Sequence, residues 1–126
     1  MATQQLEAYN TITLPAGGDL TGAQFKLVKI SSGAVVLCGA GDNAIGVLVN
    51  KPNTGEAASV QIGGIAKVQA DAALATTGTK IMSSADGQAA AATSTNHVIG
   101  MTVTTAGAAA DLVEVLLAPP PHGILA

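Results

Sequence analysis

Residues 58–70 read ASVQIGGIAKVQA, and this stretch indicates the fold class. Val60 and Ile62 alternate with polar residues, which is the period of two expected for a strand with one face toward a core. A glycine pair interrupts the pattern, and the alternation then resumes with Lys67 on the face opposite Val68. The stretch therefore predicts two strands joined by a tight connection.

Similar segments recur in both directions along the chain. Short apolar runs rich in β-branched residues are separated by clusters of Gly, Asn, Asp and Ser, which is typical of all-β proteins. Ser31-Ser32-Gly33 and Asp86-Gly87 have the composition of hairpin turns. We predict an all-β fold, a single small β-barrel or sandwich-like domain of about eight short strands. Residues 71–75, with Asp71 as N-cap, are the one stretch expected to form a helical turn.

The chain of 126 residues has room for one domain. We expect residues 1–20 to form an N-terminal arm and the first strand, residues 21–117 to form the β domain, and residues 118–126 to form a C-terminal tail. The tail begins with a proline run, which cannot continue a central strand. Both ends therefore read as extensions of the β domain.

A faint internal repeat is visible. Residues 45–49 and 59–62, separated by a Gly-containing loop, resemble residues 99–103 and 113–116. In both units an isolated Gly follows the first Ile, and such a Gly often marks a bulge or a close backbone approach. Hairpins made of Ala, Gly and Val resemble one another, so the pattern indicates a repeat without requiring one.

Composition excludes several classes of protein. Hydrophobic residues make up 48% of the chain, charged residues 10% and aromatic residues 2%, with a formal net charge of −3. A disordered chain has the opposite balance. The five basic residues are all Lys, so neither a phosphate-binding surface nor base stacking is expected, and we predict no nucleic-acid partner. Small side chains bury little apolar area, so part of the stability is expected from subunit association.

Membrane and secretion signals are not found in the sequence. No apolar run approaches the roughly 20 residues of a membrane-spanning helix, and residues 1–5 lack the features of a signal peptide. We therefore expect synthesis in a cytoplasm and no membrane partner. The single Cys38 follows an apolar run and is interpreted as a buried core residue.

A search for catalytic motifs leads to the expectation of a protein that is not an enzyme and has no cofactor. His97 and His122 lie far apart and do not form a metal motif. Residues 39–44, GAGDNA, imitate a dinucleotide loop, but a strand rather than a helix is predicted to follow, so we interpret them as a β-turn. Ser83 and Ser84 lie in a turn without a nucleophile-elbow motif.

The terminal segments carry apolar residues that would be exposed in an isolated monomer. Such residues are typical of surfaces that bind a partner or a neighbouring subunit. The candidate contact residues are Leu6, Tyr9, Ile12, Pro119, Pro120, Pro121, Ile124 and Leu125.

From Phe25 to Leu117, the order of the segments resembles the tailed-phage capsid cement, or head decoration, proteins. The matching segments include AIGVLV at residues 44–49, GEAASVQI at 55–62, and HVIGMT at 97–102. The resemblance implies a β-barrel-like homotrimer on the outer surface of a mature phage capsid, which stabilises contacts between major capsid proteins. The family's contact residues do not transfer singly, so the next expectation rests on this chain alone. We expect the N-terminal arm around Leu6, Tyr9 and Ile12 to contact the capsid, and the Pro-rich tail to contact a sister subunit or the shell.

Two alternatives remain open. The first is a β-rich binding module that recognises a host-surface glycan or a fibre partner, although scarce aromatic residues disfavour sugar stacking. The second is a carrier domain modified at Lys80, although the family motif of a Lys between two Met residues is missing.

Overall fold

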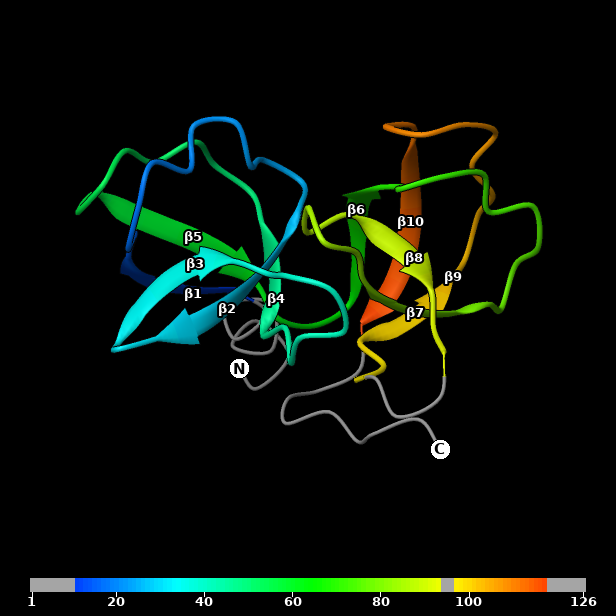
Figure 1. Ribbon diagram of the computed structural model, residues 1–126, viewed down its shortest axis with the longest axis horizontal. Helices are drawn as coiled ribbons and strands as arrows, with labels where there is room; N and C mark the ends of the chain where they lie inside the picture. Colours follow the sequence, from blue (N-terminus) through cyan, green and yellow to red (C-terminus); the bar gives the residue numbers. More distant parts are fainter. Residues whose placement is uncertain (1–10, 94–96, 118–126) are drawn as a thin grey trace, which may run out of the picture.

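Ten strands form two five-stranded antiparallel sheets in the computed structural model, which describes residues 11–93 and 97–117. Within these ranges there is no helix. Each sheet occupies its own half of the molecule, and the halves lie side by side (Figure 1). The prediction of an all-β, sandwich-like fold is confirmed, whereas the strands number ten rather than about eight, and the sheets do not close into a barrel.

The first sheet has the order β1-β5-β4-β2-β3. Its strands are β1 (Thr11–Pro15), β2 (Leu27–Ser31), β3 (Ala34–Leu37), β4 (Gly46–Leu48) and β5 (Ala57–Gln61).

The second sheet has the order β6-β10-β9-β7-β8. Its strands are β6 (Ile65–Gln69), β7 (Lys80–Ser83), β8 (Ala89–Ala91), β9 (Gly100–Thr102) and β10 (Leu112–Leu117). Three of the ten strands, β4, β8 and β9, have only three residues.

The two sheets have the same topology, because each strand of the first matches the strand five places later in the chain. The pairing register is also the same. Gly46 pairs with Val28 as Gly100 pairs with Ile81, and the β1–β5 ladder corresponds to the β6–β10 ladder. We call residues 11–61 the first repeat and residues 65–117 the second repeat.

Backbone hydrogen bonds outside the strands repeat as well. Ala16 N donates to Glu56 O and Ala70 N donates to Asp111 O, each over 2.8 Å. The faint internal repeat in the sequence therefore corresponds to a repeat of the entire fold. Because the ladders coincide, the paired strand residues of one repeat have identifiable counterparts in the other.

The prediction of a helical turn at residues 71–75 is wrong. Leu74 instead forms an antiparallel bridge with Ala106, with backbone N–O distances of 2.8 and 2.9 Å. No helix follows Asp71, so it does not act as an N-cap, and its backbone N–H donates to Ala89 O. The segment's hydrogen bonds go to distant parts of the second repeat, and this tertiary pairing overrides the local preference.

The hydrophobic core joins the repeats. One cluster lies inside the first repeat and includes Val28, Leu48 and Val60. The other contains the interior of the second repeat together with residues from the first, among them the fully buried Leu27 and Val47. The second repeat thus covers part of the outer surface of the first sheet.

Candidate functional site

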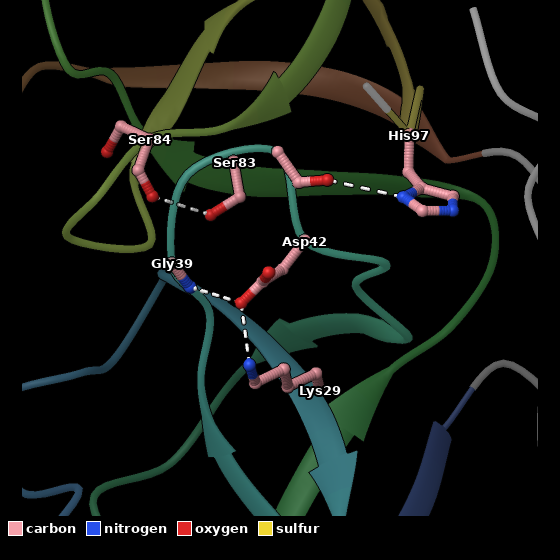
Figure 2. A network of polar contacts seen from close by, with 7 residues as sticks. Lys29, Gly39, Asp42, Ser83, Ser84 and His97 are labelled. Carbon is pink, nitrogen blue, oxygen red and sulfur yellow. Dashed lines mark hydrogen bonds and ion pairs between the residues drawn. The ribbon is translucent and has the colours of Figure 1, made fainter. Parts of the chain in front are cut away.

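A network of polar contacts connects the repeats around the loop that precedes β4 (Figure 2). Lys29 Nζ lies 2.6 Å from Asp42 Oδ2, and Gly39 N donates to the same carboxylate oxygen over 2.7 Å. On the second repeat, Ser83 O accepts a hydrogen bond from Gly41 N over 2.8 Å. The interpretation of residues 39–44 as a β-turn agrees with this geometry, since a turn at residues 40 and 41 leads into a strand.

The electrostatics of the network favour its charged form. The hydrogen bond from Lys29 and then the one from Gly39 lower the pKa of Asp42 below its ordinary value of 3.8. The same ion pair raises the pKa of Lys29 above 10.5. Asp42 is therefore ionised at neutral pH and holds the loop in place.

Ser83, His97 and Asp42 are the residue types of a catalytic triad, but their contacts do not form a proton relay. Ser83 Oγ donates to Ser84 O over 2.9 Å, and His97 Nδ1 lies 3.2 Å from Gly41 O. Both side chains therefore contact backbone carbonyls, while Asp42 binds Lys29 and Gly39. This arrangement fixes the position of the loop between the repeats.

Cys38 is buried, as predicted from its apolar neighbours. Burial, followed by the charge of Asp42, raises the pKa of its thiol to about 12. The thiol is therefore protonated at neutral pH and lacks the thiolate that nucleophilic chemistry requires.

The larger candidate surface is the exposed face of the second sheet. Ile65, Leu116, Met101 and Lys80 form one row of paired residues across β6, β10, β9 and β7. The three apolar members are 53%, 47% and 42% exposed. We call this row the open face. Exposed apolar groups in a contiguous patch are typical of an interaction surface.

The equivalent row of the first sheet has a different environment. Thr11, Gln61, Val47 and Leu27 occupy the same register across β1, β5, β4 and β2. Val47 and Leu27 are fully buried against the second repeat. The β4 and β2 part of the row is therefore covered in the first repeat, whereas its counterpart, Met101 and Lys80, is exposed in the second.

Sequence reasoning missed the open face, although a signal was present. In β10, residues 112–117 read LVEVLL, with apolar residues on both faces and one Glu at position 114. A two-sided apolar strand in an antiparallel sheet requires a cover on each face. The residues that form the row come from distant segments, so only the pairing register brings them together.

Of the predicted contact residues, Ile12 alone lies within the described ranges. It is half-buried in β1, pairs with Val60 and packs against the core of the first repeat. Leu6, Tyr9 and the five tail candidates lie outside the described residues, so these contacts remain predictions.

Two open hollows lie on the surface. One, of about 230 Å³, is lined in part by Gln24, Phe25 and Gln69 at the junction between the repeats. The other, of about 290 Å³, is lined in part by Leu14 and Pro15.

In residues 11–93 and 97–117, His, Cys, Asp and Glu side chains do not gather in a group of three that could hold a metal ion. Nor does this part of the chain contain a helix able to span a membrane.

Comparisons with known proteins point to one family. The family model described as phage cement protein matches residues 10–117. The crystal structure of the N base of the head fibre gp8.5 of bacteriophage phi29 has a similar fold, with a TM-score of 0.70. The two sequences are 18% identical, and the match covers 86% of this chain and 92% of the phi29 chain. None of the curated proteins compared with the chain matches it.

Proposed function

The chain belongs to the phage cement protein family, and from this premise we propose that it binds the outer surface of a mature phage capsid as a homotrimer. In this role it stabilises the contacts between neighbouring major capsid proteins. The observation that carries the proposal is the family match from residue 10 to residue 117, which contains all the residues that the structure describes.

The surface of the protein supports a role in assembly. The open face leaves Ile65, Met101 and Leu116 between 42% and 53% exposed on one sheet. A chain with only 10% charged residues also has few charges to remove from water when its surfaces are buried. A trimer would present each binding patch three times, so weak individual contacts would add to a strong attachment.

The terminal segments are the proposed attachment arms. We assign Leu6, Tyr9 and Ile12 to contacts with the major capsid protein. The tail residues Pro119, Pro120, Pro121, Ile124 and Leu125 are assigned to a sister subunit or to the shell. Arms outside the β domain suit a protein that folds first and binds an assembled shell later.

Add-back to purified capsids that lack the protein tests the proposal. The wild-type protein is expected to bind mature capsids to saturation and to raise the temperature at which they release DNA. Deletion of residues 1–10 should leave the urea unfolding midpoint of the β domain unchanged and lower capsid occupancy. A truncated protein that coats capsids at wild-type occupancy would show that the N-terminal arm assignment is wrong.

A second candidate function is a binding module for a fibre partner. The observation that favours it is the similar fold of the phi29 head fibre base. The two functions predict different copy numbers in the virion, because a cement protein covers the whole shell and a fibre component occupies selected sites.

The remaining alternative is a carrier domain modified at Lys80. A covalent adduct on Lys80, detected by intact-mass spectrometry, would favour it.

A further inference from the structure

The two repeats contact each other through different surfaces. The first repeat uses the outer surface of β2 and β4, where Leu27 N donates to Gly87 O over 2.7 Å. The second repeat uses a different surface, which includes the segment from Ser83 to Gly87, and Ser83 O accepts from Gly41 N. In a two-fold arrangement, both repeats would contribute the same surface to the contact, whereas here each contributes a different one. The contact is therefore of the head-to-tail, heterologous type.

A head-to-tail contact leaves one copy of each surface unused. The open face of the second repeat is the counterpart of the covered row that contains Leu27 and Val47. The segment from Ile30 to Gly33, which we call the open turn, is the counterpart of the segment from Ser83 to Gly87.

Burial differs sharply between the used and unused copies. Ser83, Ser84 and Gly87 are buried against the first repeat, whereas the open turn is exposed, with Ile30 50% accessible. Likewise, Val47 is fully buried, whereas its counterpart Met101 is 42% exposed. Ile30 and Met101 therefore expose apolar side chains at positions whose counterparts, Ser83 and Val47, are buried in the internal contact.

We propose that the open turn of one copy of the chain docks on the open face of a second copy, so that the contact between chains repeats the contact within the chain. The inference names the surfaces of the self-association in the proposed function and rests on that self-association. A heterologous contact closes into a ring when its rotation permits. In a homotrimer, the ring would hold six repeats joined by alternating internal and external contacts.

Lys80 and Pro15 give the external contact a different chemistry from the internal one. Lys80 replaces Leu27, and its aliphatic stem can cover apolar surface while the ammonium group reaches the rim of the interface. Pro15 replaces Gln69, whose N–H donates to Phe25 O over 2.8 Å inside the chain. Because Pro15 has no N–H, that hydrogen bond has no counterpart between chains.

A designed disulfide tests the proposed geometry. Inside the chain, the Cys38 and Ser83 side chains lie close to each other across the contact, since the Ser83 hydroxyl is among the groups that act on the pKa of the Cys38 thiol. Their counterparts are Ala92 and Ile30. Ile30 lies in the open turn, and Ala92 lies beside the open face, where its N–H donates to Lys80 O over 2.8 Å. The double variant Ile30→Cys with Ala92→Cys should form disulfides between chains and run as dimers and trimers on non-reducing gels. Either single variant should remain at the monomer position.

A charge on the open face provides a second test. Met101→Lys should lower the association constant about tenfold or more in sedimentation velocity, because the docked chain would desolvate the ammonium group. Leu112→Lys is the matched control. Leu112 lies on the same sheet face and is 47% exposed, but its counterpart Ala57 is not covered in the first repeat. The control should therefore associate like the wild type.

The outcomes separate this inference from the proposed function. Disulfide pairing in the double variant together with a weaker Met101→Lys association supports the inference, even if the assembled protein fails to bind capsids. Double variants that crosslink no more than the single variants would overturn it. An undiminished association of Met101→Lys would overturn it as well, as would a cover on the open face supplied by residues 118–126 of the same chain.

Discussion

Gly46 and Gly100 occupy the same position in the two repeats and meet the same obstacle. A Cβ atom at Gly46 would collide with the carbonyl oxygen of Gln61, and a Cβ atom at Gly100 would collide with that of Leu116. Each would also lie 3.0 Å from Cγ1 of a core valine, Val60 or Val115. The requirement for glycine therefore arises from the close approach of paired strands, which is one of the two roles that the sequence suggested for the Gly after the first Ile of each unit.

Substitution at either glycine should destabilise the fold. We expect Gly46→Ala and Gly100→Ala each to lower the free energy of unfolding by about 1–3 kcal/mol, because the backbone of the partner strand has to move. Urea unfolding followed by circular dichroism measures the change. Gly22→Ala is the control, since an added Cβ there has no neighbour within 4 Å and should cost little. Equal midpoints for all three variants would contradict the argument.

The counterparts Gly55 and Ala110 differ in a way that can be tested. Both have a left-handed backbone, with φ of 82° at Gly55 and 68° at Ala110. Ala110→Gly should therefore stabilise the protein by up to about 1 kcal/mol, because the conformation is strained for alanine. Ala109→Gly, at an exposed position without positive φ, should destabilise it. A loss of stability in Ala110→Gly would contradict the assignment of strain.

The ion pair between Lys29 and Asp42 predicts a pH dependence. Because the folded pKa of Asp42 lies below 3.8, its contribution to stability is present above that pH and is lost as the pH falls through the folded value. Asp42→Asn should be less stable than the wild type near pH 7, and the difference should shrink below about pH 4. Chemical denaturation across this range measures it. A difference that stays constant with pH would argue against a contribution from the charge.

Cys38 should react with thiol reagents only when the protein unfolds. Its side chain is buried, so reagents do not reach it in the native state. The pKa of its thiol is raised to about 12, so little of the reactive thiolate is present. Labelling with a chromogenic disulfide at pH 8 should be slow in buffer and fast in denaturing urea. Native protein that reacts at the unfolded rate would show that the thiol is accessible.

The sequence supported the fold class and the main turns because these depend on local pattern. The alternation around Val60 and Val68 follows from one buried face per strand, and Ser32-Gly33 adopts the positive φ values that a tight hairpin needs. The helical turn at residues 71–75 was wrong because Leu74 pairs with Ala106, a partner too distant for local reasoning.

The open face and the open turn were harder to predict, because they depend on which surface of each repeat is covered by the other repeat. Val47 and Met101 are apolar residues that each follow a glycine at the same position of their repeat. Val47 is fully buried, whereas Met101 is exposed. The difference arises from the head-to-tail arrangement of the repeats, which the pattern of a single strand does not encode. The contact residues proposed in the terminal segments still await a test.

The copy number of the protein in purified virions, measured by quantitative mass spectrometry against the major capsid protein, tests the central claim most directly. A cement protein that binds throughout the shell predicts an amount comparable to that of the major capsid protein, and a lower temperature of DNA release when the gene is deleted. Absence of the protein from virions, or its presence in only a few copies per particle, would contradict the account.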